Sequence, residues 1–240
     1  MKKKLFVLLL FFSYLQAVVL YPFYGTIDSK RVRNKLFTIS NPTKEPVAVE
    51  FSVLRLLDTD GNKEKRVKTQ DVSYYPSQFV LAPGKSRNVR VRYNKSTLPS
   101  TEEVYRVIAK ELDVDVTDRV DDAPKGKIKA TVKFRFSYEG LLFVNNGKVQ
   151  PNLTINSFKQ IGRTLEIVVA NTGTKSDVLT PNKYNILVTV NGKEYLLTPE
   201  DLKKAEFRRT LPGKTNRYRL RYIKHLPYGK ITAVRLERKK

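Results

Sequence analysis

Apolar and polar residues alternate along most of this 240-residue chain from Leu20 onward, in short runs separated by turn residues. Such alternation places one row of side chains in a core and the other in solvent, which predicts β-strands. The predicted strands are 36–40, 46–56, 79–81, 104–112, 127–138, 141–144, 153–155, 164–170, 184–190, 195–197 and 231–236. One short helix is predicted over 199–204, where Thr198 supplies the cap and Pro199 fits the first turn. The pattern indicates an all-β chain built of sandwiches.

Two stretches 129 positions apart, 83–93 and 212–222, read almost alike. Each is a Pro-Gly turn followed by a strand in which basic and apolar residues alternate. Asn41 and Asn171, each in a turn after an apolar run, recur at nearly the same offset. A period of this length suits two similar β-domains in tandem, with 140–240 as the second. The alternative is a chance match between short hairpin sequences.

The first 17 residues have the order of a secretory signal peptide. Lys2, Lys3 and Lys4 precede an apolar run over 5–15, and Ala17 closes the segment with a small residue. We therefore predict that 1–17 is removed on export and that the mature chain does not insert stably into a membrane. An uncleaved anchor is the alternative, because the apolar stretch continues to residue 20 and approaches the length that spans a bilayer.

The composition excludes several kinds of chemistry. The chain has no cysteine and one histidine, His225, so neither a Cys–His pair nor a His/Cys metal cluster can form. The sequence contains no nucleophile elbow and no glycine-rich phosphate loop. We therefore predict a protein that is not an enzyme, with no catalytic residues and no cofactor.

Two acidic segments, 58–62 and 113–122, have some features of a calcium loop. The first falls between two strands, where Asp-Gly is an ordinary hairpin turn, and no bidentate glutamate follows at the required spacing. The second carries five aspartates but lacks the central glycine of a calcium loop. The sequence therefore favours metal binding at neither segment.

The chain is strongly basic. Lys and Arg number 46 against 23 Asp and Glu, and without the three lysines of the predicted signal peptide the 43 remaining bases give a net charge of +20. Such an excess favours anionic partners, although a solvated surface suited to solubility has the same composition. Nucleic acid is disfavoured as the partner, because no recognised motif is present and tyrosines fall mostly at inward strand positions.

The predicted strand 127–138 is the most one-sided of the chain. Its alternate positions from Ile128 to Tyr138 are apolar, and the intervening positions are Lys, Thr, Arg and Ser. If the apolar face packs wholly inside its own domain, this is an ordinary core strand. If its front end projects past a sheet edge, Ile128, Ala130 and Val132 form an apolar row that is able to pair with another chain.

Several motifs follow one another in a fixed order: Asn41-Pro42 after an apolar strand, then the runs 75–84, 89–93 and 103–106. Their order and spacing resemble the PapD-like periplasmic chaperones of chaperone–usher pilus assembly, over residues 20 to about 236. The resemblance implies a boomerang of two immunoglobulin-like β-sandwich domains, 18–139 and 140–240. It also implies a periplasmic location, with pilin or fimbrial subunits and an outer-membrane usher as partners.

The resemblance further implies where a subunit binds. In that family the last strand of the first domain lends alternate apolar side chains to an incomplete subunit, a role that falls on Ile128, Ala130 and Val132. A basic residue of the same strand, deeper in the cleft, binds the subunit's C-terminal carboxylate. That role falls on Arg135, with Lys133 as the neighbour able to substitute.

The sequence departs from the family pattern at two points. The family usually has a cleft arginine on its first strand, where this chain has Gly25 unless the alignment shifts to Arg31 or Arg33. The family also tends to have Arg-Pro at the domain junction, where this chain has Glu139-Gly140. A competing interpretation is an exported immunoglobulin-like structural or adhesion module that binds an anionic cell-surface polymer.

Overall fold

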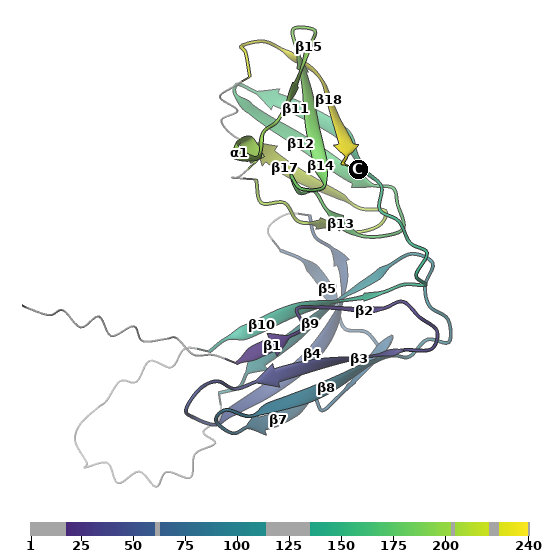
Figure 1. Cartoon of the computed structure of the whole chain (residues 1–240), viewed down its shortest axis with the longest axis vertical. Coiled ribbons are helices and arrows are strands. Elements are labelled where there is room, and N and C mark those ends of the chain that lie inside the picture. Colours follow the sequence, from purple (N-terminus) through teal and green to yellow (C-terminus); the bar gives the residue numbers. More distant parts are fainter. Residues whose placement is uncertain (1–17, 61–62, 114–134, 203–204, 221–225, 240) are drawn as a thin grey trace, which may run out of the picture.

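The computed structural model describes residues 18–60, 63–113, 135–202, 205–220 and 226–239. Two β-sandwiches follow one another along the chain and lie at an angle to each other (Figure 1). The predicted fold class, all-β with two sandwiches in tandem, is confirmed. The predicted signal peptide, 1–17, lies outside the described residues.

The N-terminal sandwich pairs a sheet of order β1-β3-β8-β6 with a sheet of order β2-β10-β9-β4-β5, in which β7 also pairs with β4. The bounds of these strands are β1 Val19–Tyr21, β2 Tyr24–Ile27, β3 Asn34–Ser40, β4 Val47–Asp58, β5 Lys65–Val67, β6 Val72–Tyr75, β7 Gln78–Leu81, β8 Ser86–Tyr93, β9 Glu103–Glu111 and β10 Ser137–Val144.

The core of this sandwich forms because alternate residues of each strand point between the two sheets. On β8, Val89, Val91 and Tyr93 are buried, whereas Arg90 and Arg92 between them are exposed. Apolar side chains from both sheets meet these residues in one buried cluster. The alternation read from the sequence therefore describes β8 correctly.

The C-terminal sandwich consists of the sheets β11-β12-β17 and β15-β14-β18 with a short β13-β16 ladder. The bounds are β11 Leu153–Ile161, β12 Thr164–Asn171, β13 Asp177–Val178, β14 Tyr184–Val190, β15 Lys193–Leu196, β16 Arg209–Thr210, β17 Thr215–Leu220 and β18 Ile231–Arg238. The predicted helix is α1, Pro199–Leu202. The hydroxyl and the N–H of Thr198 both donate to the Asp201 carboxylate, at 2.6 and 2.7 Å, which fixes the start of α1.

Strand β10 corrects one sequence-based expectation. Residues 141–144, predicted to begin the second half, continue β10 and pair with β9 on one side and with β2 on the other. The Glu139-Gly140 junction therefore lies inside a strand of the first sandwich. Gly140 serves close strand approach rather than a bend, because a Cβ there would lie 2.9 Å from the Phe23 carbonyl oxygen. We place the division between the domains after Val144, which stays a prediction.

Candidate functional site

A pocket of about 420 Å³ lies where the two sandwiches meet. One part of its wall is apolar, and another part carries charged groups from both domains. The lining residues are Phe23, Tyr24, Leu56, Thr59, Glu64, Arg106, Glu139, Gly140, Leu141, Val178, Arg208 and Arg209.

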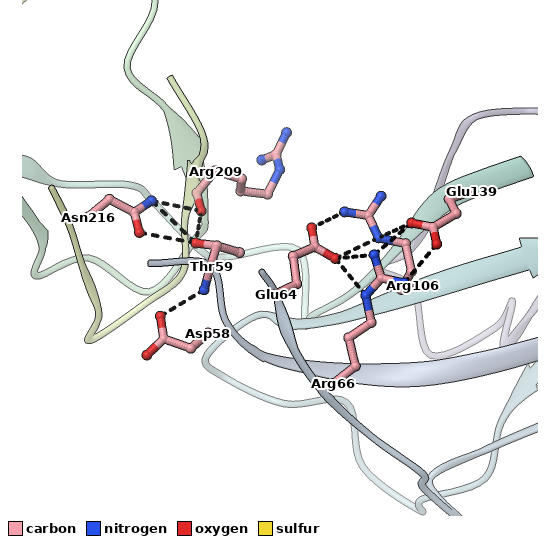
Figure 2. Close-up of polar contacts among 8 residues, drawn as sticks. All are labelled: Asp58, Thr59, Glu64, Arg66, Arg106, Glu139, Arg209 and Asn216. Carbon is pink, nitrogen blue, oxygen red and sulfur yellow. Dashed lines mark hydrogen bonds and ion pairs between the residues drawn. The ribbon is translucent and has the colours of Figure 1, made fainter. Parts of the chain in front are cut away.

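Four charged side chains of the N-terminal domain form a network at this pocket (Figure 2). Arg66 donates two hydrogen bonds of 2.7 Å to Glu139, in a paired geometry that suits guanidinium and carboxylate. Arg66 and Arg106 both also donate to Glu64. Burial raises the pKa of the Glu64 carboxyl, but the hydrogen bonds and charges of the two arginines outweigh it, so the pKa lies below its usual value. Two arginines and two glutamates make up this network, so its side chains carry no net charge.

Arg209 of β16 differs from these arginines. Its guanidinium lies 4.7 Å from the centre of the Phe143 ring and donates to the hydroxyl of Ser176 at 3.2 Å. No carboxylate of the described residues forms an ion pair with it. Burial lowers the pKa of Arg209, because its charge is removed from water. Arg209 is therefore a cleft cation that makes no direct ion pair within the described residues, although the charges of Glu102 and Asp177 act on it from nearby.

Thr59, directly after β4, contacts the C-terminal domain (Figure 2). The Thr59 hydroxyl is buried, donates to the backbone carbonyl of Arg209 at 2.5 Å and accepts from Asn216 Nδ2 at 3.2 Å. Asp58 accepts from the N–H groups of Thr59 and Asp60, which shapes the turn. The first acidic segment of the sequence thus makes a contact between the domains.

A second contact between the domains surrounds the buried carboxylate of Glu102. It accepts from the hydroxyl and the N–H of Ser176, at 2.5 and 3.0 Å, and from Asn145 Nδ2 at 3.0 Å. An apolar cluster, Leu56, Val104, Leu141 and Leu211, joins the same junction. These contacts combine polar and apolar groups, so they orient the two walls of the pocket.

The other part of the candidate site is the edge of the second sheet. Strand β2 pairs only with Leu141–Val144, so the first half of β10, Ser137–Gly140, has β9 as its one strand partner among the described residues. Phe136 and Tyr138 are half-buried with rings 6.4 Å apart, and Ser137 between them is exposed. The alternation predicted for 127–138 is confirmed for these last residues.

The predicted subunit-binding residues are placed only in part. Ile128, Ala130, Val132 and Lys133 lie outside the described residues. Arg135 is described: it precedes β10, is exposed, and forms an ion pair with Asp113. Arg135 is not among the residues that line the pocket between the domains, so its role as a carboxylate anchor stays a prediction.

The structure also places the candidates for a first-strand arginine. Gly25 of β2 is buried, and a Cβ there would lie 2.9 Å from Lys35 Cγ and 3.0 Å from Phe37 Cζ. A larger side chain at this position would therefore point into the core. Arg33 donates to the carbonyls of Lys95 and Ser96 at the surface. Neither Arg31 nor Arg33 lines the pocket.

Sequence reasoning missed the pocket's own charged groups. Glu64, Arg106 and Arg209 come from three strands or loops far apart in the chain, and no motif joins them. Their one sequence signal is weak: basic residues beside the short apolar runs near 106 and 209. In the part of the chain that the structure describes, no group of three or more His, Cys, Asp or Glu side chains could hold a metal ion.

Comparison with known proteins agrees with this architecture. The fold and the cleft define a two-domain immunoglobulin-like protein with a pocket between its domains. Residues 27–144 match the family model for the pili and flagellar-assembly chaperone, PapD N-terminal domain. By this match the N-terminal domain of the chain belongs to the family of pilus-assembly chaperones, which are not enzymes.

Solved structures extend the likeness to both domains. A chain of the CsuC–CsuE chaperone–tip adhesion subunit complex of Acinetobacter baumannii Csu pili is 17% identical, with a TM-score of 0.56, over 84% of this chain and 89% of that one. The YadV chaperone is 14% identical, with a TM-score of 0.54, over 93% and 92%. A chain of the Salmonella enterica SafA pilin–SafB chaperone complex is 18% identical, with a TM-score of 0.51, over 86% and 85%. At these identities the likeness shows the fold.

A search of curated protein sequences found no match. Among the described residues, none of the helices has the length and apolar character needed to cross a membrane.

Proposed function

We propose that this protein is a periplasmic chaperone that binds pilin or adhesin subunits by donating a β-strand and delivers them to an outer-membrane usher. The observation that carries the proposal is the open edge at the start of β10: Ser137–Glu139 pairs with β9 alone among the described strands, whereas Phe23 and β2 cover β10 from Gly140 onward. The predicted donor residues lie directly upstream in the chain. An open edge offers unpaired N–H and C=O groups to an added strand, which gives affinity, while alternate side chains give selectivity.

The donor residues follow from the parity of the strand. The residue numbers of Ile128, Ala130 and Val132 differ from those of Phe136 and Tyr138 by even numbers. A strand continued in register would therefore present all five side chains on one face. Tyr138 packs against the core of the N-terminal sandwich. Beyond the end of that core, the same row would have its apolar face available to a subunit that lacks a strand.

Two candidates exist for the group that anchors the subunit's C-terminal carboxylate. Arg135, with Lys133 as its neighbour, is the choice that the family resemblance implies, but Asp113 competes for its charge. Arg209 lies in the pocket and has no carboxylate partner among the described residues. A guanidinium in a shielded cleft binds a carboxylate more strongly than a surface pair does. We therefore propose Arg209 as a second anchor to be tested beside Arg135.

Strand donation is tested by charged substitutions in the apolar row. Ile128→Asp and Val132→Asp should leave the chaperone folded, as judged by circular dichroism, and abolish its co-purification with a co-expressed pilin. Thr131→Asp introduces the same charge on the opposite face and should retain the pilin. If the two apolar-row variants unfold the N-terminal domain instead, the segment is an ordinary core strand and strand donation is wrong.

The anchor is tested with a pilin whose C-terminus is amidated. Arg135→Ala or Arg209→Ala should weaken binding of the native pilin by roughly 2 kcal/mol or more if that residue is the anchor. The anchor variant should bind native and amidated pilin equally, whereas the wild type should distinguish them. Arg209→Lys controls for charge, and Lys133→Ala controls for strand register. A wild type that binds both pilins equally would exclude a carboxylate anchor altogether.

The location is tested by processing. Cleavage after Ala17 would make Val18 the N-terminus, and the Val18 nitrogen already donates to Glu111 Oε1 at 3.1 Å. A free ammonium there would gain an ion pair with Glu111, which favours the processed chain. N-terminal sequencing of protein from a periplasmic extract should start at Val18. A chain that retains Met1 and sediments with the inner membrane would support the anchored alternative.

A further inference from the structure

The two sheets of the N-terminal sandwich differ sharply in charge. The strands β1, β3, β6 and β8 contain no aspartate or glutamate, but they carry Lys35, Arg87, Arg90 and Arg92. All carboxylates within strands of this sandwich belong to the other sheet: Glu50, Asp58, Glu103, Glu111 and Glu139. The first sheet therefore has cations with no acidic neighbour on their own strands.

Arg90 and Arg92 stand on the outward face of β8. Both are exposed, and the residues that alternate with them are buried. Because they are two positions apart on one strand, their side chains leave the same face about 7 Å apart. In the described part of the chain neither side chain has an ion pair or hydrogen bond. Both guanidinium groups are therefore free to bind an external anion.

Apolar and aromatic side chains flank Arg90, whereas Arg92 lies across from Asn34 and Ser73. Leu36 of β3 and Tyr75 of β6 lie directly across from Arg90 in the ladder, and they are 48% and 78% exposed. Val19 and Tyr21 of β1 are exposed at the edge of the same sheet, while Leu20 between them is buried. We call this set the β8 arginine face: Val19, Tyr21, Leu36, Tyr75, Arg90 and Arg92.

We propose that the β8 arginine face docks on an anionic lipid surface. Arginine forks match phosphate oxygens, and tyrosine with aliphatic side chains suits the boundary between headgroups and acyl chains, where one end is apolar and the other is wet. A free phosphate would have no use for exposed Leu36 and Tyr75, which is why the observations favour a lipid surface. The net charge of +20 would also attract the protein to such a surface.

The proposal goes beyond subunit capture and does not depend on it. Strand β10 and the pocket between the domains belong to the other sheet and its junction. A change on the β8 arginine face should therefore alter lipid binding without altering binding of a pilin. The two properties can fail separately.

The test is sedimentation of the purified full chain with vesicles at low ionic strength. We expect binding to vesicles of phosphatidylglycerol and phosphatidylcholine in equal parts, and none to phosphatidylcholine alone. Each basic residue near an anionic bilayer strengthens binding roughly fivefold, so Arg90→Gln with Arg92→Gln should weaken binding about 25-fold. At high salt the charges are screened, so the apolar side chains contribute a larger share of the binding. Leu36→Ser with Tyr75→Ser should therefore weaken the vesicle binding that remains at high salt.

The matched control is Lys148→Gln with Lys193→Gln, which removes the same charge at two exposed positions after the first sandwich. It should bind vesicles nearly as wild type does. An equal loss in the control and in the arginine variant would mean attraction by net charge alone and would overturn the proposal. Binding to soluble polyphosphate but not to vesicles, or equal binding to neutral vesicles, would overturn it too.

Discussion

The two Pro-Gly turns of this chain are held by the same hydrogen bonds to a buried asparagine, an arrangement that we call the lock. Gly84 and Gly213 have φ values of 68° and 69°, and their N–H groups donate to the carbonyls of Asn41 and Asn171, both at 2.8 Å. Each asparagine is buried, and its amide nitrogen donates to two carbonyls of its own domain at 2.7 to 3.0 Å. The duplication read from the sequence is therefore present in three dimensions.

The outward faces of the two strands differ. Arg90 lies across from Leu36 on the neighbouring strand, and the corresponding Arg219 lies across from Glu166. Arg219 forms an ion pair with Glu166, donating from Nε at 2.8 Å, whereas Arg90 has no such partner in the described residues. The buried amides and the glycines therefore determine the backbone of both strands, whereas the outward-facing residues can differ with little effect on the stability of the fold.

The largest effect should come from breaking the lock in each copy. Asn41→Ala and Asn171→Ala remove a buried amide and leave carbonyls without donors, so each should lower the free energy of unfolding of its domain by about 2–3 kcal/mol. Urea unfolding followed by circular dichroism measures the loss. Thr38→Ala removes an exposed hydrogen bond to Asn88 and should cost far less. A loss below about 0.5 kcal/mol for either asparagine would contradict the shared lock.

Local patterns predicted most of the fold. The alternation on β8 and β14, the Pro-Gly turns and the Thr198 cap depend on neighbours in sequence, so the sequence carries them. The end of β10 was mispredicted, because Gly140 indicates a turn by itself. Only its contact with the Phe23 carbonyl, more than a hundred residues away, shows that the glycine permits strand pairing.

The candidate site was predicted less well. The one-sided pattern of 127–138 left a core strand and an edge strand both open, and in the structure only the start of β10 lies at an edge, because β2 pairs with Leu141–Val144. The pocket brings together Glu64, Arg106 and Arg209 through tertiary packing, which no local pattern encodes. The charge difference between the two sheets likewise appears only once strand order is known, because adjacent strands in a sheet are not adjacent in the chain.

The second domain contains a buried carboxyl group, that of Asp177. Burial raises the pKa of Asp177, but Lys183, the Val178 N–H and the Tyr184 hydroxyl outweigh it and set the pKa below its usual value. A lowered pKa stabilises the fold above the unfolded-state value, and this contribution is lost as the pH falls through the folded-state value. Stability of the second domain should therefore decrease as the pH falls from 6 to 3.

Asp177→Asn should lower the free energy of unfolding by about 1–2 kcal/mol at pH 6, because hydrogen bonds to a charged group are lost. It should also flatten the dependence on pH, which urea titrations at several pH values would measure. Asp28→Asn, at an exposed carboxyl, is the control. An unchanged slope would exclude Asp177 as the titrating group.

The two copies also differ at one position within the motif. Asn216 is buried and bonds to Thr59 of the other domain, whereas Arg87 at the matching position is exposed and lies over the Phe79 ring. Thr59→Val removes the hydroxyl and should weaken the contact between the domains by about 1 kcal/mol. Small-angle scattering should show a wider range of domain orientations, while circular dichroism stays unchanged. Identical scattering would mean that Glu102 and the apolar cluster hold the junction without Thr59.

The smallest expected effect tests the outward difference itself. Leu36→Glu gives Arg90 the partner that Glu166 gives Arg219, and a double-mutant cycle with Arg90→Ala should show a coupling of about 0.2–1 kcal/mol. The cycle of Glu166→Leu with Arg219→Ala should give a coupling of similar size, and both should shrink at high salt because exposed charges are screened. Urea unfolding at two salt concentrations measures all seven chains, because the two cycles share the wild type. Coupling in the second domain but none in the first would show that the cross-strand residue alone does not decide whether the arginine is paired.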